Sequence, residues 1–215
     1  MRGDPQPLAD ETDAIRRCQQ GDIAALGALV THYQTPAVRL AYLLTGDQDL
    51  ANDIAQDSFL LAWRGIRRFR LGEPFAPWFY RIVTNSARQQ MRSARYRREV
   101  SLEALVSDDP DARRLGVSLA ATQASQADPE ERAERAEAWA ALLAALAALP
   151  QKQREAVVLR YYLGYTDRQA ATILGCHVGA IQQRLHDGRA SLQRAIRTRY
   201  PWLLRSLPTL SSSEP

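Results

Sequence analysis

The chain has 215 residues, of which 46% are hydrophobic, and its 28 basic and 24 acidic side chains leave a net charge of +4. This composition excludes a chain that is disordered throughout, and the length allows one large or two small domains. No run of about 18 apolar residues is present, so no membrane insertion is expected, and the N-terminal sequence lacks the apolar segment of a secretory signal. Two cysteines, Cys18 and Cys176, cannot form a disulfide framework, so we expect a cytoplasmic protein.

The net charge is an average over four blocks of opposite sign. It is −5 over residues 1–63, +9 over 64–98, −6 over 99–151 and +7 over 152–205. Every basic residue except Lys152 is Arg, whose planar guanidinium suits phosphate and guanine. A GC-rich genome accounts for the preference for Arg over Lys but not for the blocks. Two basic blocks separated by an acidic one indicate two places that meet a polyanion.

Helical periodicity dominates the first half of the chain, and no strand pattern stands out. Asp22 and Asp47 are typical helix N-caps, and Gly21 and Gly46 are typical helix ends. Pro36 lies inside an apolar periodic run, where it should kink or break the helix. Helices are therefore expected over 10–20, 22–44 with an interruption at Pro36, 47–63 and 75–98.

The periodic pattern dissolves over residues 99–128, which are rich in acidic and small polar residues, and resumes afterwards. Further helices are expected over 129–149, 151–163, 167–174 and 177–200. The predicted fold class is all-α, with two small helical domains joined by a flexible acidic linker. We divide the chain into a first domain at 10–98, a linker at 99–128, a second domain at 129–200 and a C-terminal tail at 201–215. For the tail, a loose segment and a short apolar segment that docks on the protein both remain open.

Residues 166–200 show the pattern of a helix-turn-helix. A short helix precedes Gly175, which supplies a left-handed turn, and apolar residues then recur on one face of the next helix. The remaining faces present side chains that hydrogen-bond to base edges or phosphates. An ordinary helical hairpin with a solvated polar face is the alternative, and the basic block favours DNA. The candidates for duplex contact are Arg168, Gln182, Gln183, Arg184, His186, Asp187 and Arg189.

The helix expected over 75–98 carries a basic stripe on one face and aromatic residues beside it. A surface that binds single-stranded nucleic acid needs arginines that contact the sugar-phosphate backbone and aromatic rings on which the unstacked bases can stack. For Trp78 and Tyr80, base stacking and burial in the core both remain open. An Arg-rich segment precedes the helix. The candidates for single-strand contact are Arg67, Arg68, Arg70, Trp78, Tyr80, Arg81, Asn85, Arg88 and Arg92.

No catalytic or metal-binding pattern stands out in the sequence. Asp49, Asp53 and Asp57 share one helix face, but no His is nearby, so a protein-docking surface or simple solubility is a better interpretation than a metal site. The three histidines are scattered, and the two cysteines fall in different predicted domains. We expect no enzyme activity, no metal and no cofactor.

Three segments in order resemble the extracytoplasmic-function (ECF) group of sigma-70 factors. Residues 53–63, DIAQDSFLLAW, resemble the family's core-polymerase-binding segment, and residues 75–85, FAPWFYRIVTN, resemble its −10 recognition helix. Residues 149–157, LPQKQREAV, together with 175–181, GCHVGAI, resemble its −35 reading domain. The recognition helix is less basic than the resemblance would suggest, so no −35 sequence is assigned.

The resemblance implies a transcription initiation factor that binds core RNA polymerase and directs it to promoters. The first domain would dock on the polymerase clamp and take the −10 non-template strand, and the second would read the −35 duplex and hold the polymerase flap. The acidic linker would follow the RNA exit path, and a helical anti-sigma factor would restrain the chain. The implied polymerase contacts are Asp53, Gln56, Asp57, Phe59 and Trp63.

A stand-alone helix-turn-helix regulator is the alternative function. It would explain residues 150–198 through duplex binding alone. It would leave the Arg-rich stripe over 64–98 and the segment over 53–63 without a role, and binding to core polymerase separates the two hypotheses.

Overall fold

The computed structural model describes residues 10–101 and 129–202, and these ranges hold helices and connecting turns without a strand. The expected all-α fold is therefore confirmed. Most of the predicted linker and all but the start of the predicted tail lie outside the described residues. None of the helices in the described ranges combines the length and the apolar character that a membrane span requires.

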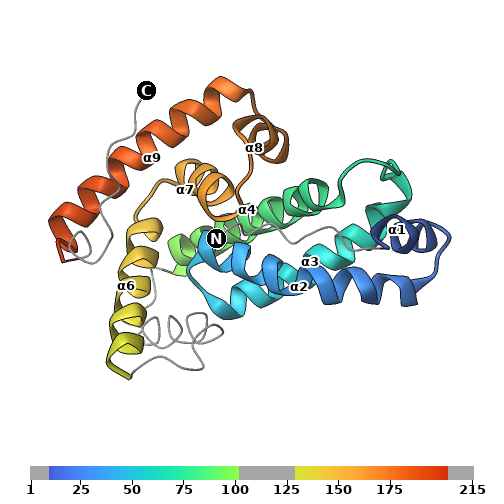
Figure 1. Ribbon diagram of the computed structural model, residues 1–215, viewed down its shortest axis with the longest axis horizontal. Coiled ribbons are helices and arrows are strands. Elements are labelled where there is room, and N and C mark those ends of the chain that lie inside the picture. Colours follow the sequence, from blue (N-terminus) through green and yellow to red (C-terminus); the bar gives the residue numbers. More distant parts are fainter. Residues whose placement is uncertain (1–9, 102–128, 203–215) are drawn as a thin grey trace.

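The first half of the chain forms a bundle of four helices with a short 3-10 turn (Figure 1). Asp22 accepts a hydrogen bond from Ala24 N, and Asp47 accepts one from Leu50 N, so both expected N-caps are confirmed. Gly46 ends its helix in the left-handed conformation, at φ 77°. The elements are α1 (Glu11–Gln19), α2 (Ile23–Thr45), α3 (Gln48–Gly65), η1 (Ile66–Arg68) and α4 (Phe75–Ser101).

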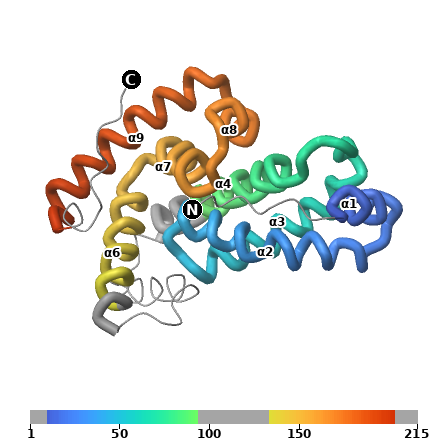
Figure 2. The backbone as a smooth tube through the Cα atoms, viewed as in Figure 1, coloured from blue at the N-terminus to red at the C-terminus, as the bar shows by residue number. Residues whose placement is uncertain are grey.

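Helix α2 runs through Pro36 as one element, so of the predicted kink or break at this residue the break is wrong (Figure 2). Leu29 and Tyr33 before the proline, and Leu40 after it, are all buried in the same core. Burial of apolar groups on both sides outweighs the loss of one backbone hydrogen bond at Pro36.

The second half contains the helix-turn-helix and two helices that precede it. Thr166 accepts from Gln169 N, while the Gln169 side chain accepts from Thr166 N, which is a complete capping box. Gly175 ends α8 at φ 64°, as predicted, and the His177 ring caps α9 by accepting from Ala180 N. The elements are α6 (Pro129–Ala147), α7 (Gln151–Val157), the π-helical segment η4 (Val158–Tyr162), α8 (Asp167–Leu174) and α9 (Val178–Arg199).

Aromatic rings fill the centre of the first bundle. Tyr33 packs against Phe75 and Phe79 with ring centroids 5.2 and 5.7 Å apart, and Phe59 lies 4.6 Å from Phe79. All four side chains are buried. This cluster holds α2, α3 and α4 together and fixes which face of α4 points outward.

Gly188 allows α9 to approach α7 closely. A Cβ placed on this glycine would lie 2.8 Å from Val157 Cγ2, nearer than real Cβ contacts come. Glycine costs a helix interior about 1 kcal/mol relative to alanine, so its presence here reflects the packing of the two helices.

Replacing Gly188 with Ala is expected to lower the free energy of unfolding by about 1–3 kcal/mol, because the new methyl group overpacks the contact with Val157. Gly27 in α2 is the matched control, since a Cβ there meets no atom within 4 Å. Gly27→Ala should raise the free energy of unfolding by up to about 1 kcal/mol. Urea unfolding measures both changes, and a Gly188→Ala variant as stable as the parent would contradict this account of the packing.

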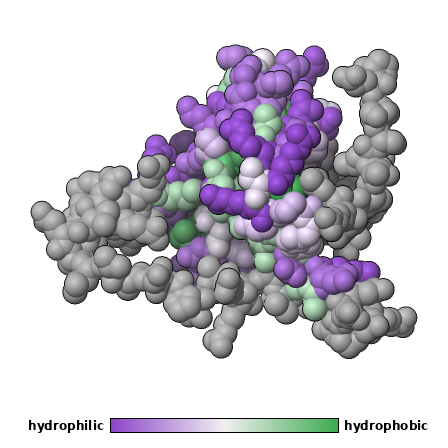
Figure 3. Space-filling model, turned by 90° about the vertical axis from the view of Figure 1, so that its left-hand side faces the viewer, coloured by the Kyte–Doolittle hydropathy of each residue, from purple (hydrophilic) through white to green (hydrophobic). Residues whose placement is uncertain are grey.

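The two halves lie against each other, with α7 and α8 over α4 and with α6 beside the end of α2 (Figure 1). Seen from the side of α6 and the C-terminal end of α9, the surface is mostly hydrophilic, with smaller apolar areas lower down (Figure 3). A cavity of about 570 Å³ lies there between the end of α2, α6 and the residues that follow α9. Trp202, the last described residue, lines this cavity.

Candidate nucleic-acid interface

The Arg-rich segment between α3 and α4 is held in place by two anchors. The Gln19 side chain donates hydrogen bonds to the carbonyls of Ile66 and Phe69, at 3.0 and 2.7 Å. The Phe69 ring is buried, with its centroid 5.1 Å from that of Trp78. The sequence prediction named the arginines of this segment but missed Gln19, which lies 47 residues from Ile66 and has no local signal.

Three arginines point outward from this anchored segment. The side chains of Arg67, Arg68 and Arg70 are all exposed. Arg68 and Arg70 line a cavity of about 390 Å³ together with Trp78 and Arg81 of α4. Half-buried Trp78 therefore presents a ring beside two exposed cations, which is the arrangement that an unstacked base and its phosphate would need.

Tyr80, for which the sequence left base stacking and burial open, is buried in this structure. It has no exposed surface, and its ring centroid lies 6.3 Å from that of Tyr33 and 6.2 Å from that of Tyr165. The prediction that Tyr80 contacts DNA is not met in this arrangement, because Tyr165 of the second half covers it. Burial is the physical reason, and helical periodicity could not show it.

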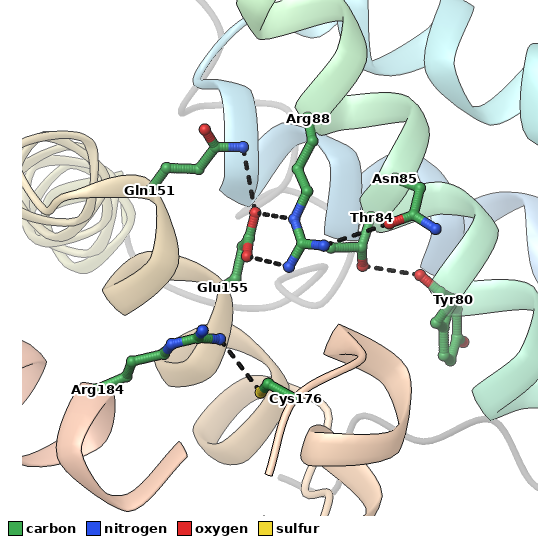
Figure 4. A network of polar contacts seen from close by, with 8 residues as sticks. All are labelled: Tyr80, Thr84, Asn85, Arg88, Gln151, Glu155, Cys176 and Arg184. Carbon is green, nitrogen blue, oxygen red and sulfur yellow. Dashed lines mark hydrogen bonds and ion pairs between the residues drawn. The ribbon is translucent and has the colours of Figure 1, made fainter. Parts of the chain in front are cut away.

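The polar stripe of α4 is partly covered by the second half of the chain. Arg81, Asn85 and Arg92 are exposed, whereas Arg88 is half-buried. Arg88 donates from Nε and Nη2 to the two carboxylate oxygens of Glu155, at 2.8 and 2.6 Å (Figure 4). These hydrogen bonds raise the pKa of Arg88, so the guanidinium stays charged.

The outer face of α3 combines carboxylates with exposed leucines. Asp53, Gln56 and Asp57 are exposed, as expected for a docking surface. Leu60 and Leu61 are 56% and 45% exposed and line a groove of about 270 Å³ between α3 and α4. Both leucines lie in the segment 53–63 that resembles the polymerase-binding segment, but they were not among the residues predicted to contact polymerase. Apolar residues beside an acidic line on a helix are a signal that could have singled them out.

The two aromatic residues predicted to bind polymerase are buried to different extents in α3. Trp63 is half-buried and packs against the core. Phe59 is buried against Phe79, so it supports the surface from beneath and is not part of it. Within the described ranges, no three His, Cys, Asp or Glu side chains are grouped to hold a metal ion.

Helix α9 presents the expected polar residues of the helix-turn-helix. Ile181 and Leu185 are buried against the rest of the second half. The exposed candidates are Arg168 on α8 and Gln182, Gln183, His186 and Arg189 on α9, whereas Arg184 and Asp187 are half-buried.

Two of the candidates on α9 make hydrogen bonds of their own. The Gln183 amide donates to Asp187 Oδ1 at 2.9 Å, and Arg184 donates to Cys176 Sγ at 3.3 Å. Asp187 therefore orients Gln183, and Arg184 reaches back toward the turn of the motif.

The family models match both halves of the chain. The model of sigma-70 region 2 matches residues 29–97, and the model of sigma-70 region 4 matches residues 139–192, so that together they cover more than half of the chain.

Curated relatives belong to the same family. The chain is 32% identical over 192 residues to a probable RNA polymerase sigma factor, RfaY, of Xanthomonas campestris, an alignment that covers 89% of this chain and 44% of that protein. It is 29% identical to the RNA polymerase sigma-H factor of Pseudomonas aeruginosa, with 88% and 96% of the two chains covered. It is 28% identical to the ECF RNA polymerase sigma factor SigW of Bacillus subtilis, with 85% and 95% covered.

Two solved structures share the fold. CnrH, solved with the cytosolic domain of CnrY, aligns with a TM-score of 0.59 at 22% identity and covers 87% of this chain and 97% of that one. The sigma factor RpoE of Bartonella quintana, solved with the anti-sigma factor NepR, aligns with a TM-score of 0.59 at 24% identity and covers 79% and 95%. The chain belongs to the sigma-70 family of RNA polymerase sigma factors, as a promoter-directing transcription initiation factor of the ECF group.

Proposed function

We propose that three surfaces of this chain divide the work of a sigma factor. The outer face of α3 binds core polymerase, the Arg-rich segment with α4 takes the −10 strand, and the outer face of α9 reads the −35 duplex. The α3 face is the observation that carries the proposal, because a regulator that binds only duplex DNA has no use for it.

The α3 face has the anatomy of a protein interface. Leu60 and Leu61 supply an apolar centre, and exposed Asp53, Gln56 and Asp57 supply a polar rim. The negative side chains favour a partner surface with basic residues. The sigma-70 family supplies the identity of that partner, core RNA polymerase.

The Arg-rich segment suits a strand of separated DNA. Arg67, Arg68 and Arg70 would bind phosphates without regard to sequence, and Trp78 would stack on a base in the adjoining cavity. No covalent chemistry is needed, because opening of the duplex draws on binding free energy that the polymerase shares.

The α9 surface suits the major groove of a duplex. A Gln side chain hydrogen-bonds to N6 and N7 of adenine, and an Arg side chain hydrogen-bonds to O6 and N7 of guanine. Gln183 and Arg189 are exposed on α9. We assign the adenine type of contact to Gln183 and the guanine type to Arg189. Asp187 restricts Gln183 to one orientation and so sharpens its choice of base.

Gln183→Ala is expected to weaken the preference for one base at one −35 position, because the residue contacts a base edge. The difference in binding free energy between the preferred base and the other bases should fall by about 1–3 kcal/mol. Arg194→Ala is a comparison on the same helix at a position that we do not assign to base contact. Selection from a randomised −35 library by the reconstituted holoenzyme measures the preference. A preference that is unchanged in Gln183→Ala would contradict the base contact.

Binding to core RNA polymerase separates the proposed division of surfaces from binding of duplex DNA alone. Mixing the purified chain with core RNA polymerase and separating the mixture by size-exclusion chromatography distinguishes the two. Co-elution at one-to-one stoichiometry supports the proposed assignment of the surfaces, whereas a chain that elutes alone but still shifts duplex DNA contradicts it.

An inhibitory protein partner belongs to the same proposal. CnrH and the Bartonella RpoE were each solved with a partner, and for RpoE that partner is an anti-sigma factor. We expect this chain to bind one as well. The test is recovery of a bound protein from the chain's own cells that blocks transcription by the reconstituted holoenzyme, and recovery of core polymerase alone contradicts the expectation.

The remaining expectations extend beyond the described residues. The acidic linker over 99–128 is proposed to follow the RNA exit path, and only 99–101 are described, as the end of α4. The division into domains at 10–98 and 129–200 is part of the same proposal, and so is action in the cytoplasm without catalysis.

A further inference from the structure

One cavity lies outside the surfaces proposed for polymerase and DNA. It is the cavity of about 570 Å³ between α6, the end of α2 and the residues that follow α9. On its α6 side it is lined by Ala140, Ala144 and Ala147. Tyr42 of α2 and Trp202 line other parts of it. None of the residues that line this cavity belongs to the three proposed surfaces, so the proposed function leaves it unexplained.

The α6 side of the cavity is apolar. Ala140, Ala144 and Ala147 are exposed, and Leu143, which also lines the cavity, is half-buried. Alanine has a short side chain, so these residues leave space above the helix for larger apolar side chains. Packed protein interiors leave few voids larger than a water molecule. A space of this size with an apolar wall is therefore suited to a further segment of protein.

The chain itself supplies a segment of matching chemistry at the edge of the cavity. The described residues end at Trp202, which is half-buried and lines the cavity. The sequence continues as LLRSLPTLSSSEP, so three leucines, Leu203, Leu204 and Leu207, follow within five positions of Trp202. Arg205 lies among them and is opposite in charge to Glu137, an exposed carboxylate that lines the cavity on α6.

We propose that residues 203–207 dock in this cavity, with their leucines on the alanines of α6 and Arg205 beside Glu137. The segment starts at Trp202, so its docking is intramolecular, and a short connection gives it a high effective concentration at the cavity. A second copy of the chain would have to bind without that advantage. The docked segment would tie the C-terminal end of α9 to α6 and so brace the half that carries the helix-turn-helix.

The test measures how quickly trypsin releases the end of the tail from the full-length chain. Trypsin cleaves after Arg205, and the released peptide, SLPTLSSSEP, is identified by its mass. Cleavage requires an undocked segment, so the initial rate reports the undocked fraction. A synthetic peptide of residues 200–210 gives the cleavage rate without docking. We expect the chain to be cleaved at Arg205 at least about tenfold more slowly than the peptide.

Three variants separate docking from a general effect of substitution. Ala144→Trp fills the cavity from its α6 side, so it should raise the cleavage rate to that of the peptide. Ala190→Trp adds the same ring at an exposed alanine of α9 that does not line the cavity, and it should keep the parent rate. Leu207→Ser, compared with a peptide that carries the same change, should also lose protection. A circular dichroism melt confirms that each variant is folded.

Sedimentation velocity of the parent chain shows whether a second copy occupies the cavity instead. Docking of the tail is overturned if the parent is cleaved as quickly as the peptide, or if Ala190→Trp loses as much protection as Ala144→Trp. It is also overturned if Leu207→Ser stays as protected as the parent. A parent dimer that Ala144→Trp converts to a monomer would assign the cavity to a second copy and overturn the proposal as well. A monomeric parent with a protected tail that both Ala144→Trp and Leu207→Ser expose supports it.

Discussion

Leu60→Asp is expected to weaken binding of the chain to core RNA polymerase by roughly thirtyfold or more, which corresponds to at least 2 kcal/mol. The side chain is exposed at the centre of the α3 face and adjoins the groove that Leu61 also lines. A carboxylate there would be desolvated against the partner without a counter-charge. Competition binding with a labelled reference sigma factor measures the change.

Ile23→Asp is the matched control for this prediction. Ile23 is 68% exposed at the start of α2 and is not among the residues assigned to the proposed interface, so the same kind of substitution should leave polymerase binding within twofold. Because Leu60 is exposed, neither variant should lose much stability. Equal losses of binding in the two variants would show that the leucines of α3 have no special role.

Simultaneous replacement of Arg67, Arg68 and Arg70 by Ala is expected to reduce binding of the holoenzyme to a −10 single strand more than tenfold. Each phosphate contact releases counterions, so the slope of log affinity against log salt should also fall by about 2 when three contacts are lost. The side chains are exposed, and the anchors Gln19 and Phe69 are untouched. Anisotropy titrations at several salt concentrations measure both quantities.

The triple Lys variant at the same positions shows whether the effect of the triple Ala variant comes from the loss of positive charge. Lysine keeps the positive charge, so the salt slope should be retained while affinity falls modestly with the loss of bidentate geometry. An unchanged slope in the triple Ala variant would mean that these arginines do not contact phosphate. The −10 surface would then have to lie elsewhere on the first half.

Local sequence signals predicted the helices well, because caps and turns depend on neighbouring residues. Asp22, Asp47 and Gly175 each take the local role expected of them. Pro36 shows where such reasoning fails, since long-range burial of Leu29 and Leu40 keeps α2 continuous despite a residue that disfavours helix.

The candidate site was predicted as a set of residue types, not as an arrangement. Exposed Arg67, Arg70 and Arg81 follow from charge and periodicity alone. The burial of Tyr80 beneath Tyr165 and the pairing of Arg88 with Glu155 both depend on how the two halves pack. That packing joins residues 67 or more positions apart, so no local pattern could have revealed it.

The most direct test of the sigma assignment is transcription in vitro with core RNA polymerase, the purified chain and fragments of the chain's own genome, with start sites mapped by sequencing. Transcription is expected to start at a defined set of sites that share −35 and −10 elements. These starts should disappear when Leu60→Asp replaces the parent chain at limiting concentration. Transcripts that are the same with and without the chain, while the chain still binds duplex DNA, would contradict it.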